Sequence, residues 1–224
     1  MTTHDHPNAI SLRAVRIEGR RDTMLDPVTL RLERGSRLLV VAEPGHGHTA
    51  LALVATGRMV PDEGDVLLDG VPDPAALRRV SAVVDAPSIT EPDDALTVGG
   101  TVAEGLALAG RPSGRRALAR WLDEHDLAEH RSLRVDQLDP VTRVQTLLAL
   151  GAADPAVQYL VLTLPDRHGG NPKDWWRIAG GYAESGYGVL VQCTPASAHV
   201  LEAGRHIERP VEGTDNHDAM EVLR

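Results

Sequence analysis

The chain has 224 residues, which fits one large α/β domain, or one domain with a subdomain, that can bury a sizeable core without disulfides or metals. A net charge of −9 argues against a nucleic-acid partner, and the single cysteine, Cys193, excludes an intramolecular disulfide. Residues 1–8 are polar and no apolar run approaches the roughly 20 residues of a membrane helix, so we expect a cytoplasmic protein.

The pattern of the first 84 residues predicts several strands and two helices, of which the first is almost free of charge. The alternation of apolar and polar residues predicts an edge strand at 10–18 and further strands at 28–33, from Arg37, at 66–68 and at 80–84. Helical periodicity predicts helices at 49–59 and 73–79.

Three helices, expected at 96–109, 115–128 and 141–153, follow a Pro- and Asp-rich loop at 86–94 and interrupt the strands. The chain then alternates again, with strands at 159–164 and 188–193 and helices at 171–185 and 197–203. Asn171 and Pro172 are a capping side chain and a proline suited to the first helical position.

Strands separated by helices imply a parallel sheet with right-handed crossovers. We therefore predict an α/β fold with a P-loop-like parallel-sheet core, N-terminal antiparallel strands and an inserted helical subdomain. The predicted division is a tail at 1–9, the core at 10–94 and 154–209, the subdomain at 95–153 and a second tail at 210–224.

Residues 42–49 have the layout of a phosphate-binding loop, G-x-x-x-x-G-K-[ST]. Ala42 takes the first glycine's position, Gly47 the second, His48 the lysine's and Thr49 that of the hydroxyl, which can hold Mg²⁺. Backbone amides at such a turn attract anions, whereas the alternative is that the glycines serve the turn alone. The candidate nucleotide-binding residues are Gly45, His46, Gly47, His48, Thr49 and Ala50, with Thr49 as the candidate magnesium ligand.

The order of elements and several phrases resemble the nucleotide-binding domain of ATP-binding-cassette (ABC) transporters. Residues 61–70 resemble that family's P-x-x-G-x-[VI]-x-[LV]-x-G, and residues 77–84 resemble its strand leading into the Q-loop. Residues 96–106 are similar to its L-T-V-x-E-N-L entry to the helical subdomain, and residues 132–162 to its signature helix and Walker B strand. The resemblance covers roughly residues 10–209.

The motifs that carry catalysis in this family are altered here. Histidine replaces the Walker A lysine at His48, and Asp85 stands at or beside the Q-loop glutamine. The signature L-S-G-G-Q corresponds to residues 138–142, Leu-Asp-Pro-Val-Thr. The Asp-Glu-Pro end of Walker B corresponds to residues 163–165, Thr-Leu-Pro, and the switch histidine to Pro195.

These replacements predict weak ATP binding and little or no hydrolysis. A free histidine has a pKa of about 6.5, so His48 is mostly uncharged at neutral pH unless a phosphate raises that pKa. Losing a charged hydrogen bond costs roughly 1.5–3 kcal/mol, or about ten- to a hundredfold in affinity. If the loop is functional, protonated His48 replaces lysine and ATP binds more tightly at pH 6 than at pH 8. Thr163 cannot act as a metal-side carboxylate and Leu164 cannot orient water, so we predict no catalytic residue.

The resemblance implies an ATP-binding subunit that works beside a membrane permease subunit, as a homodimer or as a heterodimer with another such subunit. It would bind ATP weakly, with Mg²⁺, and serve coupling or regulation from the cytoplasm or from the inner face of the membrane. The alternative is a scaffold that binds no nucleotide and acts through protein contacts.

Three further features have competing interpretations. Asp85 is either a metal-site carboxylate or, as we favour, a solvated residue at the start of a loop. Neighbouring helical residues point about 100° apart. We therefore predict that one of Trp175 and Trp176 lies in the core and that the other is free to contact a partner protein. Residues 166–170 are interpreted as an ordinary loop without chemistry.

Overall fold

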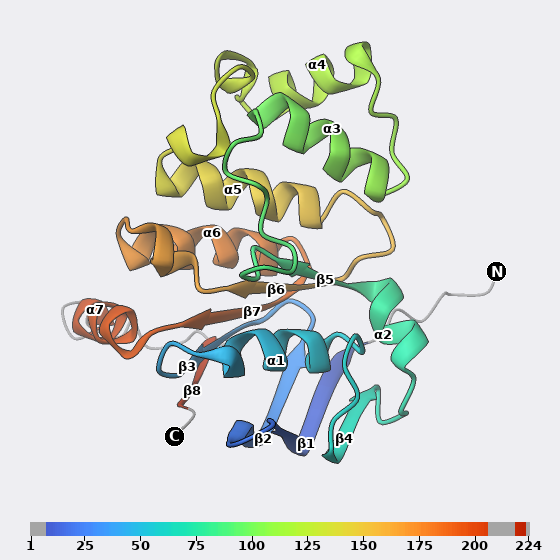
Figure 1. The fold of residues 1–224 in the computed structure, drawn as a ribbon, viewed down its shortest axis with the longest axis vertical. Coiled ribbons are helices and arrows are strands. Elements are labelled where there is room, and N and C mark those ends of the chain that lie inside the picture. Colours follow the sequence, from blue (N-terminus) through green and yellow to red (C-terminus); the bar gives the residue numbers. More distant parts are fainter. Residues whose placement is uncertain (1–7, 206–217, 223–224) are drawn as a thin grey trace.

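The computed structural model describes residues 8–205 and 218–222, which form two sheets with one helix between them (Figure 1). The smaller sheet is antiparallel, in the order β2-β1-β4. Its strands are β1 (Ala9–Glu18), β2 (Thr23–Glu33) and β4 (Glu63–Leu68).

The larger sheet is parallel, in the order β5-β6-β7-β3-β8. Its strands are β3 (Arg37–Val41), β5 (Ser81–Val84), β6 (Tyr159–Thr163), β7 (Gly188–Cys193) and β8 (Asp218–Val222). β6 and β7 are buried along their whole length, because helices cover both faces of the sheet.

The helices divide the molecule into layers (Figure 1). The α-helices of the described residues are α1 (His46–Ala55), α2 (Pro74–Val80), α3 (Val98–Leu108), α4 (Arg115–Glu124), α5 (Pro140–Gly151), α6 (Pro172–Glu184) and α7 (Pro195–Arg205). α1 lies between the two sheets and its apolar residues, such as Leu51 and Val54, fill the core between them. α5 and α6 cover the other face of the parallel sheet.

α3 and α4 lie beyond α5, away from the sheets (Figure 1). They share a small apolar core that includes Val102 and Leu122. α5 connects this core to the main one, because Leu150 packs against both, while Leu148 is fully buried toward the sheet. The 3-10 helices η1 (Ala128–His130) and η2 (Val135–Gln137) lie between α4 and α5 in the chain, whereas η3 (Pro165–His168) follows β6.

The predicted fold class is confirmed, as is the start of α6, where the Asn171 side chain accepts from the Lys173 amide and Pro172 takes the first helical position. Several local predictions are wrong. β1 is the central strand of its sheet and not an edge strand; register shifts beside Ala14, whose φ is 46°, blur its alternation. α1 begins at His46 and not at Thr49.

The predicted tails differ from the structure at both ends of the chain. Ala9 already belongs to β1, and residues 218–222, assigned to a C-terminal tail, form β8 beside β3. The rest of the predicted tails, residues 1–7, 210–217 and 223–224, lies outside the described residues, apart from Asn8, which precedes β1.

Both tryptophans of α6 are buried, which contradicts the prediction that one is free. Trp175 is 3% exposed and Trp176 is 8% exposed, with their rings edge to face at 6.5 Å. α6 packs against α5, α7 and the sheet, so adjacent positions on it both meet neighbours. The Arg37 guanidinium lies 4.3 Å from the Trp176 ring centroid and also donates to the Trp176 carbonyl.

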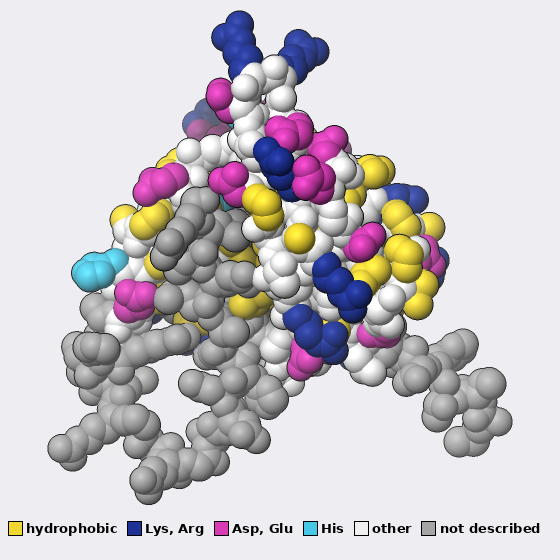
Figure 2. Space-filling view, turned by 90° about the horizontal axis from the view of Figure 1, so that it is seen from below, with side chains coloured by type: hydrophobic (Ala, Val, Ile, Leu, Met, Phe, Trp, Pro, Cys, Tyr) yellow, Lys and Arg dark blue, Asp and Glu magenta, His cyan; other side chains and the backbone are white. Residues whose placement is uncertain are grey.

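The surface seen from below carries basic, acidic and hydrophobic side chains intermingled among the described residues, without a basic patch on that face (Figure 2). No helix within residues 8–205 is long and apolar enough to cross a membrane.

Candidate functional site

The turn between β3 and α1 opens onto a pocket of about 1260 Å³. Its walls come from this turn and from the segment joining β1 to β2, and the lining residues are Gly19, Arg20, Arg21, Asp22, Thr23, Met24, Leu25, Asp26, Pro27, Val41, Ala42, Glu43, Gly45, His46, Gly47 and Pro195. A Cβ on Gly47 would lie 3.1 Å from the Met24 carbonyl oxygen, so the approach of β2 restricts the side chain at this position.

The six candidate nucleotide-binding residues divide into two groups in the structure. Gly45, His46 and Gly47 line the pocket, whereas His48, Thr49 and Ala50 are not among its described lining residues. His48 is only 2% exposed, and its Nε2 lies 3.2 Å from the Ala42 carbonyl oxygen at the start of the same turn. The imidazole is therefore buried beneath the loop.

His48 lies near Gln192, which is paired with Thr163 in the parallel sheet, and we call these three buried residues the polar cluster beneath the turn. Thr163 and Gln192 are paired neighbours on β6 and β7, and both are fully buried. His48 Nδ1, Thr163 Oγ1 and both amide atoms of Gln192 have no hydrogen-bond partner among the described residues. Thr163 and Gln192 therefore offer this cluster several hydrogen-bonding groups but no formal charge.

Burial lowers the pKa of His48, although the Ala42 carbonyl, Gln192 and the charge of Asp166 act in the opposite direction. Burial favours the neutral imidazole, whereas a replacement for the lysine of a phosphate-binding loop would have to be a cation. This environment therefore does not favour the idea that protonated His48 replaces lysine.

The segment after β6 carries no acid at its first two positions. Leu164 is 9% exposed and adopts a left-handed conformation, with φ 48° and ψ 55°. Its amide donates to the Gln192 carbonyl oxygen at 2.9 Å. Asp166, two residues later, uses Oδ2 to accept from the Thr194 amide and hydroxyl and from the Ser197 hydroxyl, so this oxygen serves the start of α7.

Residues 138–142, which correspond to the signature in the resemblance, span the N-cap and the first residues of α5. Asp139 caps the helix, and its Oδ1 accepts from the Val141 amide at 3.0 Å and from the Thr142 amide at 3.1 Å. Hydrogen bonding from the Thr142 side chain is the largest of the effects that lower the pKa of Asp139. A carboxylate thus already uses amides that an external anion would need at this helix N-terminus.

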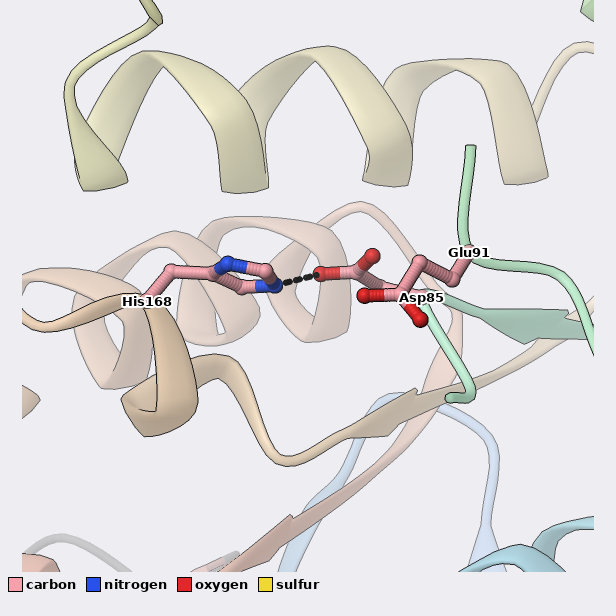
Figure 3. Close-up of side chains that lie close together, drawn as sticks. All are labelled: Asp85, Glu91 and His168. Atoms are coloured by element: carbon pink, nitrogen blue, oxygen red, sulfur yellow. Dashed lines mark ion pairs between the residues drawn. The ribbon is translucent and has the colours of Figure 1, made fainter. Parts of the chain in front are cut away.

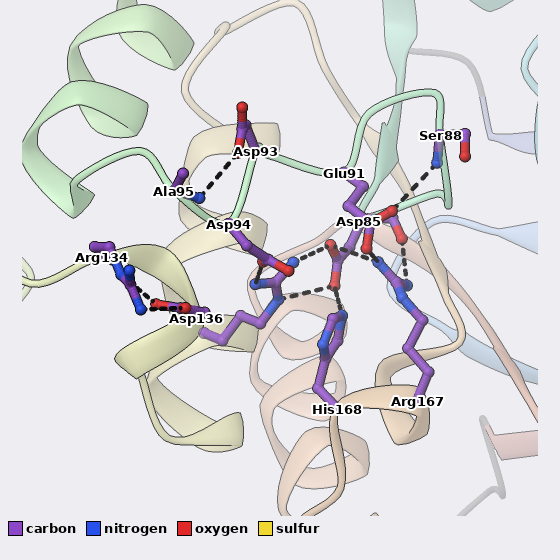
Figure 4. Close-up of polar contacts among 11 residues, drawn as sticks. Asp85, Ser88, Glu91, Asp93, Asp94, Ala95, Arg134, Asp136, Arg167 and His168 are labelled. Carbon is purple, nitrogen blue, oxygen red and sulfur yellow. Dashed lines mark hydrogen bonds and ion pairs between the residues drawn. The ribbon is translucent and has the colours of Figure 1, made fainter.

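A second polar cluster surrounds Asp85, whose side chain is fully buried at the end of β5 (Figures 3 and 4). Arg143 on α5 and Arg167 in η3 place guanidinium nitrogens 3.0 Å and 2.9 Å from Asp85 Oδ1. His168 Nε2 lies 3.2 Å from the other carboxylate oxygen. We call Asp85, Arg143, Arg167 and His168, with the two outer acids Glu91 and Asp94, the Asp85 network.

The outer acids extend this network into the loop at 86–94 (Figure 4). Glu91 pairs with Arg167 at 2.9 Å, and Asp94 pairs with Arg143 at 3.1 Å. The network therefore joins the end of β5, the following loop, α5 and η3.

Burial by itself would raise the pKa of Asp85. The His168 and Arg143 contacts and the two arginine charges outweigh it, so the pKa is lowered. The buried carboxylate is therefore ionised and needs its cationic partners.

Asp85, Glu91 and His168 offer ligand atoms within 4.8 Å of one another, which raises the question of a metal centre (Figure 3). Both carboxylates already accept hydrogen bonds from Arg167, and Asp85 accepts from Arg143 as well. A cation would have to displace these guanidinium groups. The donor set fits a closed ion-pair network better than a metal site.

The network overturns two of the sequence interpretations. Asp85 is not a solvated loop residue, and residues 166–170 are not a loop without chemistry, since Arg167 and His168 are its partners. One signal in the sequence pointed toward it. Arg143 stands beside Val144 on the apolar face of the predicted helix at 141–153, and a charge on a buried face requires a partner.

Comparison with known proteins agrees with this architecture. No family model matches the chain. It is 26% identical over 147 residues to the ribose import ATP-binding protein RbsA 3 of Rhizobium etli, covering 65% of this chain and 28% of that protein. It is 32% identical over 101 residues to the ABC transporter ATP-binding protein RamB of Streptomyces coelicolor, covering 44% of this chain and 16% of that protein.

Solved structures show the same fold. The bacterial ABC transporter cassette MJ0796, described as dimeric, superposes with a TM-score of 0.64 at 18% identity, over 86% of this chain and 90% of that one. The chain thus resembles ABC transporter ATP-binding proteins in sequence and has the fold of their cassettes. It spans less than a third of the length of the two curated relatives described above.

The neutral burial of His48 predicts a specific pH dependence of stability. Because its folded pKa lies below 6.5, acidification through about pH 6.5 protonates this residue in the unfolded chain first. The free energy of unfolding should therefore decrease as the pH is lowered, by up to about 1.4 kcal/mol per pH unit from this group, until the folded pKa is reached. In urea unfolding at pH 7.5, 6.5 and 5.5, His48→Gln should lose less stability on acidification than the unmutated protein. A control variant, His199→Gln, replaces an exposed histidine of α7. An equal fall in the unmutated protein and His48→Gln would contradict neutral burial.

The Asp85 network predicts a large difference between two arginine substitutions. Arg143→Met leaves Asp85 without one of its partners in the core and should lower the free energy of unfolding by about 3–5 kcal/mol. Arg134→Met removes an exposed pair with Asp136 and should cost less than about 1 kcal/mol. Urea unfolding of both variants at pH 7.5 measures the two costs. Similar small losses would mean that the network is not a structural requirement.

Proposed function

We propose that this chain, which has the ABC cassette fold and resembles ABC transporter ATP-binding proteins in sequence, is a cassette subunit that couples or regulates transport with little or no ATP hydrolysis. It binds ATP weakly and works beside a membrane permease subunit, as a homodimer or as a heterodimer with another cassette. Its location in this proposal is the cytoplasm, at the inner face of the membrane.

The observation that carries the proposal is the burial of His48, which favours the neutral imidazole. The residue at the lysine position is 2% exposed, turns toward the Ala42 carbonyl and has a lowered pKa. Phosphoryl transfer relies on positioned cations and an oriented water. Thr163 and Leu164 offer no carboxylate for a magnesium ion or for that water, so the residues present do not fit a hydrolytic magnesium centre.

Weak nucleotide binding is supported by the turn before α1. No side chain caps this helix and its first turn carries no acid, so backbone amides there are available to a phosphate. Arg20 and Arg21 line the same pocket, but Asp22, Asp26 and Glu43 line it too. The local charge therefore gives a polyanion no strong advantage.

Coupling is supported by the loop at 86–94, which in the resembled family lies where the cassette meets its permease. Ile89 is 51% exposed and Leu96, just beyond the loop, is 40% exposed. The Asp85 network ties this loop to α5 and to η3 through buried ion pairs. A displacement of this loop would then move α5, η3 and the end of β5 together.

The second candidate is a scaffold that binds no nucleotide. Two observations favour it: His48 is withdrawn from the pocket, and Asp139 already occupies amides at the start of α5. In this case protein contacts alone would define the function.

Calorimetric titration with MgATP separates the two candidates. The cassette proposal predicts weak binding that His48→Gln changes by less than about twofold, because a buried neutral ring makes no charged contact with phosphate. Phosphate release should stay at the level of a control without protein. No heat at protein concentrations near a millimolar would favour the scaffold. Magnesium-dependent turnover that His48→Gln abolishes would contradict both.

Copurification tests the partner. A complex with a permease subunit in mild detergent is expected for a coupling cassette. A stable homodimer without a membrane partner, indifferent to ATP, would favour the scaffold instead.

A further inference from the structure

We propose that a second pocket, remote from the turn before α1, binds a small organic anion. The pocket has a volume of about 510 Å³, within the usual range for small-molecule sites. It lies where the segment after α4 (residues 125–130) meets α5 and α6, on the opposite face of the parallel sheet from α1.

The described lining of the pocket holds one permanent cation that can pair with an anionic group of a ligand. Arg177 on α6 is a permanent cation, and His125 and His130 come from the segment after α4. Asp126 is the one carboxylate among the described lining residues. Arginine in particular presents paired donors that match a carboxylate or phosphate.

The ring of His125 is held in place before any ligand arrives. It stacks on Trp121 with centroids 3.9 Å apart and planes 18° apart. Its Nδ1 lies 2.8 Å from the Trp121 carbonyl oxygen, which can only accept, so Nδ1 carries a proton. Nε2 is therefore the ring nitrogen that can meet a ligand.

His130 supplies a second, independent indication of a missing partner. Its Nδ1 is buried and has no hydrogen-bond partner among the described residues, although its backbone amide donates to the Leu127 carbonyl. Buried polar atoms are rarely left without a partner in native proteins, so a ligand group or a water at this nitrogen is expected.

The rest of the pocket suits a compact body attached to the anionic group. Leu127 and Ile178 provide apolar contacts. Burial raises the pKa of Tyr182 to about 12, so its hydroxyl keeps its proton at neutral pH and can donate. A ligand here would contact α5, α6 and the segment after α4 at the same time. It would therefore hold the α3–α4 region against α6, which covers the parallel sheet.

The test uses benzoate, which joins a planar apolar ring to one carboxylate, and benzamide as its neutral isostere, with inorganic phosphate as a second anion. Calorimetry of the whole chain should show benzoate binding at least about tenfold more tightly than benzamide, the loss expected for a charged hydrogen bond. Arg177→Gln should weaken benzoate by about the same factor. A matched control, Lys173→Gln, removes an exposed cation of α6 outside the pocket and should change affinity by less than about twofold.

The outcomes separate the sources of the anion and the competing sites. Tighter binding of phosphate than of benzoate, with the same sensitivity to Arg177, supports the site and assigns it to a phosphate ester. Equal binding of benzoate and benzamide would overturn the anion proposal in favour of a purely apolar pocket. Anion binding that responds to Arg20→Gln and ignores Arg177→Gln would place it at the turn before α1, and would also overturn the proposal. None of these outcomes depends on ATP binding.

Discussion

The buried carboxylate of Asp85 is the constraint on which the relation between the sheet and the helices depends. An ionised carboxylate out of water is stable only with cationic partners and hydrogen bonds, and Asp85 finds them on α5 and in η3. Arg143 and Arg167 in turn hold Asp94 and Glu91 of the loop between β5 and α3. One charge therefore fixes four segments at once, and the helical part cannot turn freely against the parallel sheet without exposing or breaking ion pairs.

The polar cluster beneath the turn before α1 differs from the Asp85 network in its charge. There burial favours an uncharged His48, and Thr163 and Gln192 carry no charge. In the resembled family a lysine and an aspartate occupy the positions of His48 and Thr163. Both positions therefore lack the charged side chain that the resembled family has there. The interior of this chain thus holds an ionised carboxylate at Asp85, whereas burial favours a neutral His48 beneath the turn before α1.

Two helix N-termini show how the same backbone feature is used differently. α1 begins at a pocket without a capping side chain, so its first amides remain available. α5 begins with Asp139, whose carboxylate takes up two of the corresponding amides. The position of one capping side chain thus separates a place that can receive an anion from one that cannot.

The sequence by itself determined what depends on neighbours along the chain. Periodicity predicted the parallel core and the order of its elements, and Asn171 with Pro172 predicted the start of α6, because patterning and capping act over a few residues. Tertiary structure decided the rest. The place of β1 in its sheet, the pairing of β8 with β3 and the burial of both tryptophans depend on which surfaces meet. The partners of Asp85 lie 58 and 82 positions away along the chain, a separation that only the assembled fold closes.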